Sequence, residues 1–132
     1  MRRTGSCLCG QATFSAEARP RLQACHCAMC RKWVGGPFMA VPCDHAEFQG
    51  PVKRYQSSEG FERGFCGNCG SSLYFHPKGS GLHGIPLGLF DDQTGLPFLT
   101  EFFIDQKPDC YAFANDTNQM TGAEFMETFR KR

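Results

Sequence analysis

The chain has 132 residues, of which 41% are hydrophobic, and its 14 basic and 13 acidic side chains nearly balance. This length predicts one domain over residues 1–132, and the composition excludes a disordered segment, a coiled coil and a collagen-like repeat. No apolar stretch reaches the roughly 18 residues that cross a bilayer, and the arginines after Met1 precede no hydrophobic run. We therefore expect a cytoplasmic globular protein that does not bind a membrane.

Short segments rich in aromatic or branched side chains alternate with glycine, proline and polar residues, which is typical of many short strands. In chain order, a strand is expected over Gln11–Ser15 and a helical turn over Ala28–Trp33, where Gly35, Gly36 and Pro37 end it. Further strands are expected at segments such as Phe38–Val41, Val52–Tyr55, Ser72–Phe75 and Leu99–Ile104. The pattern predicts a mainly-β domain.

The clearest helix signal is near the end of the sequence. Thr121 and Glu124 have the spacing of a capping box, and Phe125 and Phe129 then fall near one face. The basic residues Arg130, Lys131 and Arg132 follow. We therefore expect a short C-terminal helix that needs packing to persist.

The nine cysteines are an odd number, so they cannot all form internal disulfides. In a reducing cytosol, clustered cysteines more often bind a metal than form bridges. Seven of them lie in three short motifs, a CxC at Cys7 and Cys9, a CxCxxC at Cys25, Cys27 and Cys30, and a CxxC at Cys66 and Cys69. Cys43 and Cys110 stand alone, and we interpret them as buried or half-buried thiols. Thiolates at such short spacings favour zinc.

A closed structural zinc site needs four ligands, and the two cysteine pairs supply them. We assign Cys7, Cys9, Cys66 and Cys69 to this site, because the glycines after Cys66 and Cys69 are typical of a zinc knuckle. The remaining three cysteines can hold a second zinc with one position free, which is the arrangement of catalytic zinc. Spacing alone does not prove this division, since a CxCxxC motif and one distant cysteine also provide four sulfurs.

Other interpretations of the three central cysteines stay open at this stage. His26, His45 or Cys43 could complete a purely structural site, or the cysteines could be buried thiols without a metal. An iron–sulfur cluster is less well supported, because no run of four cysteines has a ferredoxin spacing. Seven thiolates and two zinc ions together contribute three negative charges, which would change the formal +1 of the chain to about −2. Zinc held by three thiolates is a weak Lewis acid that binds an incoming thiol well, so the site predicts sulfur chemistry.

The segments GSCLCG, CHCAMCRK, RYQSS and ERGFCGNCGSSL, with the glycine pair at 35–36, resemble the glutathione-dependent formaldehyde-activating enzyme family, which includes centromere protein V-like members. The resemblance covers most of the chain and weakens after about Leu89. It implies a zinc-stabilised β-tent fold, a structural zinc on the four cysteines assigned above, and a second zinc on Cys25, Cys27 and Cys30 where the glutathione sulfur binds. The implied reaction adds glutathione to formaldehyde and belongs to the carbon–sulfur lyases.

Two further side chains are candidates for the chemistry. Arg63 is the best candidate among nearby basic residues to bind a carboxylate of the thiol. His26 could shuttle a proton near neutral pH, although alternation in an extended CxC motif points it away from the metal and fits a packing or hydrogen-bonding role equally well. The chain departs from the family pattern at Glu101, where histidine is frequent, and at Cys110, where tryptophan is frequent. These departures leave the ligands intact but put the natural substrate in question.

Charge and aromatic content decide between the remaining classes of function. Residues 1–63 hold nine basic and five acidic side chains, whereas residues 79–129 hold one and eight, which indicates either two differently charged faces or an anion-attracting front half. Trp33 and the thirteen phenylalanines are expected mostly in the core, with Trp33 alternatively lining a pocket. Dispersed basic residues disfavour a nucleic-acid interface. We therefore predict a two-zinc enzyme acting on a glutathione adduct, with a non-catalytic zinc module that binds a protein partner as the alternative.

Overall fold

Ten strands and two α-helices follow one another in the computed structural model, which describes residues 1–130. The strands are β1 (Arg2–Ser6), β2 (Thr13–Ala18), β3 (Leu22–Cys25), β4 (Phe38–Gln49), β5 (Val52–Ser58), β6 (Phe61–Cys66), β7 (Ser72–Pro77), β8 (Leu82–Pro86), β9 (Phe98–Phe102) and β10 (Asn118–Met120). The helices are α1 (Ala28–Val34) and α2 (Gly122–Arg130). This confirms the predicted mainly-β class with a short C-terminal helix. Lys131 and Arg132 lie outside the described residues.

Each of the five expected strand segments overlaps an observed strand. The largest difference is at β4, which continues past Val41 to Gln49. From Asp44 onward, half-buried and exposed positions alternate along this strand, and polar residues occupy the exposed ones. A strand predicted from a run of apolar residues therefore ends before the observed strand does, because only one side of this part of β4 is covered by other residues.

Both expected helices form where their end signals predict them. At the start of α1, the Sγ of Cys27 accepts a hydrogen bond from the Cys30 amide, and Gly35 ends the helix with a φ of 84°. At the start of α2, the side chains of Thr121 and Glu124 each accept a hydrogen bond from the other residue's amide, at 3.2 and 2.9 Å. The predicted capping box is therefore present.

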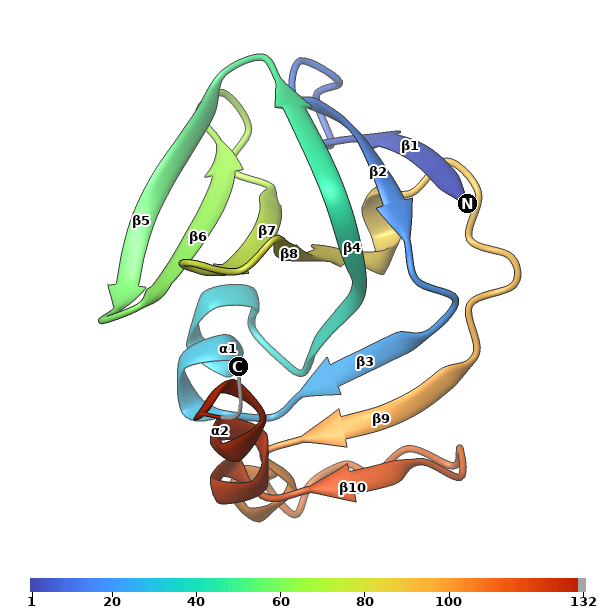
Figure 1. Cartoon of the computed structure of the whole chain (residues 1–132), viewed down its shortest axis with the longest axis vertical. Coiled ribbons are helices and arrows are strands. Elements are labelled where there is room, and N and C mark those ends of the chain that lie inside the picture. The colour runs from blue at the N-terminus through green and yellow to red at the C-terminus, as the bar shows by residue number, and fades with distance from the viewer. Residues whose placement is uncertain (131–132) are drawn as a thin grey trace.

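One mixed sheet contains all ten strands of the described chain, in the order β10-β9-β3-β4-β8-β7-β6-β5, with β2 joining β4 to β1. The strand β9 runs parallel to β3 and to β10. Figure 1 shows the sheet bent so that the β5–β6 hairpin faces β3, β9 and β10, with α1 and α2 at the lower left between these two parts. The strand β3 ends beside α1 (Figure 1).

The hydrophobic core lies mainly around β2, β4 and β8. Along β2, Phe14, Ala16 and Ala18 are buried and their neighbours are not, as expected for alternation in a strand. Val41 on β4 pairs with Ile85 on β8, and both side chains are fully buried. No helix in the described part of the chain has the length and apolarity of a membrane span.

Candidate metal centres and cavity

Four cysteines from distant parts of the chain come together at one site. Cys7 follows β1, and Cys9 lies in the next turn. Cys66 ends β6, and Cys69 lies in the turn between β6 and β7. Their sulfurs all lie within 4.8 Å of one another, with 3.5 Å between Cys7 and Cys9 and 3.8 Å between Cys9 and Cys66. A tetrahedron with Zn–S bonds of about 2.3 Å has S–S edges of about 3.8 Å. The four-cysteine site therefore fits a closed zinc centre.

Hydrogen-bond donors point at the sulfurs of this site. The amide of Ala12 donates to Cys7 Sγ at 3.3 Å, and the amide of Cys69 donates to Cys66 Sγ at 3.5 Å. Hydrogen bonds from Ser71 lower the pKa of Cys69 to about 5. These donors favour the thiolate form, which is the form that binds a metal.

The other three clustered cysteines meet where β3 passes into α1, and we call them the triplet. Cys25 ends β3, Cys27 caps the N-terminus of α1, and Cys30 lies in the first turn of that helix. Their sulfurs lie within 4.8 Å of one another, and no fourth Cys, His, Asp or Glu of residues 1–130 joins the group. Because a helix cap brings the donors together, the triplet fits a metal site with three protein ligands and a place for an outside ligand.

Hydrogen bonding among the three thiols separates their pKa values. Hydrogen bonds from Cys25 and Cys30, with a smaller contribution from the Arg63 guanidinium, lower the pKa of Cys27. Hydrogen bonding to Cys27 raises the pKa of Cys25. Cys27 is therefore the thiol of the triplet that ionises most readily.

The side chains considered as a fourth ligand are engaged elsewhere. Cys43 is fully buried and donates to the carbonyl of Val41 at 3.4 Å, and burial raises its pKa to about 12. His45 is exposed on β4. His26 has both ring nitrogens in hydrogen bonds to other residues. The triplet is thus not completed by any of the three.

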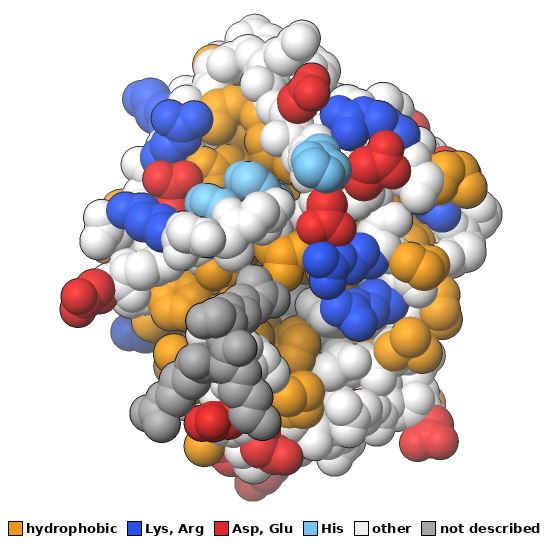
Figure 2. Space-filling view, viewed as in Figure 1, with side chains coloured by type: hydrophobic (Ala, Val, Ile, Leu, Met, Phe, Trp, Pro, Cys, Tyr) orange, Lys and Arg blue, Asp and Glu red, His pale blue; other side chains and the backbone are white. Residues whose placement is uncertain are grey.

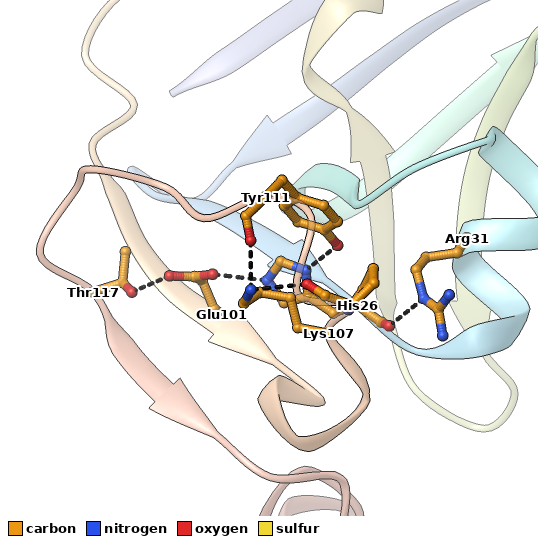
Figure 3. A network of polar contacts seen from close by, with 7 residues as sticks. His26, Arg31, Glu101, Lys107, Tyr111 and Thr117 are labelled. Carbon is orange, nitrogen blue, oxygen red and sulfur yellow. Dashed lines mark hydrogen bonds and ion pairs between the residues drawn. The ribbon is translucent and has the colours of Figure 1, made fainter.

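The fully buried ring of His26 lies in a polar network (Figure 3). Its Nε2 is 2.7 Å from Oε1 of Glu101, and its Nδ1 is 2.7 Å from the hydroxyl of Tyr111. Burial opposes a charge on Glu101, but hydrogen bonds from Thr117 and His26 lower the pKa of this carboxyl. Arg31 Nε also donates to the backbone carbonyl of His26 at 2.9 Å. His26 lies between Cys25 and Cys27, and the network fixes both its side chain and its backbone carbonyl.

The two departures from the family pattern have different surroundings. Glu101 is buried in the His26 network, where a carboxylate accepts the imidazole hydrogen bond. Cys110 is exposed, whereas the sequence predicted a buried or half-buried thiol. The prediction for Cys110 is wrong because this residue lies in the long connection between β9 and β10. Such connections run over the protein surface, and their sequence has no periodic pattern from which burial can be predicted.

Arg63 places a buried cation beside the triplet. The residue is 3% exposed, and its Nη2 lies 3.4 Å from Cys30 Sγ. The guanidinium carbon lies 5.0 Å from the ring centre of Phe75 and 6.0 Å from that of Trp33. Its Nη1 has no hydrogen-bond partner among residues 1–130. Arg63 therefore contacts a sulfur of the triplet and keeps one buried donor without a partner among these residues.

A cavity of about 570 Å³ lies beside the triplet and is lined by all three of its cysteines. In the described chain, four buried side-chain polar atoms lack a partner, and they are Arg21 Nε, Ser57 Oγ, Arg63 Nη1 and His83 Nδ1. All four residues line this cavity. Its described lining also includes Arg19 but no Asp or Glu. A lining with unpartnered polar atoms and arginines but no acidic side chain favours an anionic or acceptor-rich ligand. On the face viewed in Figure 2, Lys and Arg side chains lie beside hydrophobic ones, and Asp and Glu side chains lie there as well.

Comparison with known proteins places the chain in a family. Residues 2–106 match the family described as glutathione-dependent formaldehyde-activating enzyme. The chain belongs to this family. A Schizosaccharomyces pombe protein named an uncharacterized lyase is 39% identical over an alignment 132 positions long, which covers 96% of this chain and 96% of the yeast protein. The crystal structure of a Rhodobacter sphaeroides protein has a similar fold, with a TM-score of 0.58 and 18% identity over 72% of this chain and 98% of the other.

In this member of the family, several cavity residues carry no signal in the sequence. Arg21 directly precedes β3, Ser57 lies on β5 and His83 lies on β8, and no local motif connects them. Trp33 does not line the cavity and instead donates from Nε1 to Ser72 Oγ at 3.2 Å. Seven of the thirteen phenylalanines line the cavity, whereas only three phenylalanines are buried in the core. The expectation that they mostly fill the core is therefore wrong, because alanine and smaller aliphatic side chains fill much of it.

Proposed function

We propose that the chain is a carbon–sulfur lyase that joins a low-molecular-weight thiol such as glutathione to an aldehyde such as formaldehyde, and cleaves the adduct in reverse. We further propose two zinc ions per chain, a structural one on the four-cysteine site and a second on the triplet. The observation that carries the proposal is the triplet, which has no fourth Cys, His, Asp or Glu ligand among residues 1–130 and lines a cavity with buried, unpartnered polar atoms. The family and the lyase named in fission yeast support it.

The proposed addition is a balanced step without oxidation or reduction. The thiol sulfur forms a bond to the aldehyde carbon, the carbonyl π bond breaks, and the thiol proton ends on the former carbonyl oxygen. When bound at the triplet, zinc supplies a cation that favours the thiolate form of an incoming thiol. The cavity walls bind the two reactants and exclude water from them.

The basic lining residues are spaced to bind a tripeptide thiol. Arg21 directly precedes β3 and Cys25 ends it, so their Cα atoms are about 13 Å apart at about 3.3 Å per residue. The thiol of glutathione is on its central residue, so each carboxylate-bearing end lies about 7 Å away along the extended chain, and the arginine side chain shortens the remaining gap. A thiol at the triplet can therefore direct one carboxylate to Arg21, while Arg63 lies close enough to bind a nearer acceptor.

We assign a binding role to Arg63 and a positioning role to His26. Arg63 lines the cavity with an unpartnered Nη1, which suits it to donate a hydrogen bond to a carboxylate. His26 does not line the cavity, and Glu101 and Tyr111 engage both ring nitrogens. This arrangement favours support of the Cys25–Cys27 backbone over the proton-shuttle role. We propose a reducing cytoplasm as the location, because clustered cysteines there bind a metal more often than they form disulfides.

Metal analysis and NMR exchange together test the proposal. We expect two zinc ions per chain, a change in the absorption of the cobalt-substituted protein on adding glutathione, and faster NMR-detected exchange between glutathione and its formaldehyde adduct. Cys27→Ser should abolish the spectral change and the faster exchange. A protein with one zinc ion and no response to thiols would instead favour the non-catalytic module that binds a protein partner.

A further inference from the structure

Five phenylalanines form a continuous row of rings in the cavity that the triplet lines, and we call them the aromatic belt. Consecutive ring centres lie 5.3 Å apart from Phe75 to Phe61, 5.8 Å from Phe61 to Phe129, 5.0 Å from Phe129 to Phe125, and 4.7 Å from Phe125 to Phe102. All five residues line the cavity. The belt therefore forms an apolar wall of the cavity, whereas the arginines make another part of the lining basic.

Both ends of the belt adjoin the triplet. Phe75 lies under the Arg63 guanidinium, and Arg63 Nη2 contacts the sulfur of Cys30. At the other end, Phe102 on β9 pairs in register with Cys25 on β3. A group attached to a sulfur at the triplet therefore has the aromatic belt as its surroundings on one side.

Neither glutathione nor a hydroxymethyl group matches this wall. Glutathione has two carboxylates, an ammonium group and two amides, and placing these against phenylalanine rings removes water without replacing its hydrogen bonds. The hydroxymethyl group adds only one carbon and one hydroxyl oxygen to the sulfur, so it has almost no apolar surface to place against the phenylalanine rings. The belt therefore fits a larger, apolar group on the sulfur.

The segment that closes the belt lies beyond the part of the chain that matches the family. The match ends at residue 106, and Phe125 and Phe129 come from α2. Met126 on the same helix also lines the cavity. The part of the wall that α2 contributes can thus differ within the family while the cysteine ligands stay the same.

We propose that the aromatic belt is a binding subsite for an apolar aldehyde-derived group, aromatic or branched, on the sulfur of the thiol adduct. This inference rests on the proposed function, since it places the thiol sulfur at the triplet. The reacting aldehyde is then a larger apolar one, R–CHO, and the product is the hemithioacetal with R against the belt. The bonds formed and broken are those of the formaldehyde reaction.

Binding of stable thioethers tests the subsite without turnover. Calorimetric titration of the zinc-loaded protein would compare glutathione, S-methylglutathione and S-benzylglutathione, since the two thioethers carry the same glutathionyl arm. Burial of one phenyl ring against the belt should make S-benzylglutathione bind roughly 10- to 100-fold more tightly than S-methylglutathione. Equal affinities for the two thioethers, with glutathione still bound, would overturn the subsite and leave the proposed function standing. Failure of all three ligands to bind would overturn both.

A matched pair of variants locates the effect on α2. Met126 is 41% exposed and lines the cavity, whereas Leu99 on β9 is 46% exposed and does not line it. Met126→Ala should reduce the benzyl preference several-fold, and Leu99→Ala should leave it unchanged. Phe125→Leu should reduce it further while keeping an apolar side chain that packs α2. Two results would contradict a subsite at the belt. One is an equal loss of the benzyl preference in Leu99→Ala, and the other is an unchanged preference in both Met126→Ala and Phe125→Leu.

Discussion

Replacing Arg63 with leucine tests the link between the buried guanidinium and thiol binding. The side chain is 3% exposed and its Nη1 has no partner among the described residues, so a ligand carboxylate would gain a hydrogen bond that the protein alone does not make. Hydrogen bonds to charged groups contribute about 1.5–3 kcal/mol, which corresponds to roughly 10- to 150-fold in Kd. We expect Arg63→Leu to weaken glutathione binding by this factor in calorimetric titration.

Controls separate this effect from damage to the metal site. At 3.4 Å and an effective dielectric constant of about 20, a unit charge on Arg63 and one on Cys30 interact by about 5 kcal/mol, so the zinc content of each variant must be measured. Arg63→Lys keeps the charge and should recover part of the affinity. Arg54→Leu removes an arginine that is 70% exposed, and it should leave the glutathione affinity and the zinc content unchanged. The diester of glutathione should bind Arg63→Leu and the unchanged protein alike. Unchanged glutathione affinity in a fully metallated Arg63→Leu protein would refute the carboxylate contact.

Three further predictions concern stability. Cys66→Ser should leave little folded protein, because a structural zinc site contributes about 10–16 kcal/mol, whereas Cys27→Ser should stay folded by circular dichroism; equal unfolding would contradict the distinction between the sites. Glu101→Leu should lower the Tm by about 10 °C, since an unpaired His26 costs about 3 kcal/mol, and a shift below about 3 °C would show that the pair contributes little. Burial lowers the pKa of His83 from 6.5 to about 4, so the unfolded chain takes up a proton that the folded chain does not. Stability is then lost as the pH falls below 6.5, and urea titrations should show about 1.3 kcal/mol more loss from pH 7.5 to 5.5 than in His83→Phe; equal losses would refute this.

The local signals in the sequence predicted the local structure well. Thr121 and Glu124 predicted the start of α2, and Gly35 predicted the end of α1, because caps depend on residues within one turn. The mainly-β class followed from short segments of aromatic and branched residues. The second half of β4 was not predicted, because polar residues alternate there with few apolar ones, and periodicity indicates a strand only where one face is clearly apolar.

The sequence by itself determined which cysteines form short clusters that could hold a metal, because ligand type and spacing are set within a few residues of each cysteine. The division into a four-cysteine site and a triplet was a prediction from coordination number, and the grouping of the sulfurs in the structure agrees with it. Only the tertiary structure decided what surrounds the triplet. The aromatic belt joins β6, β7, β9 and α2, and the unpartnered donors come from elements just as far apart. Such contacts depend on how the sheet bends and where α2 packs, and no periodicity along the chain records that arrangement.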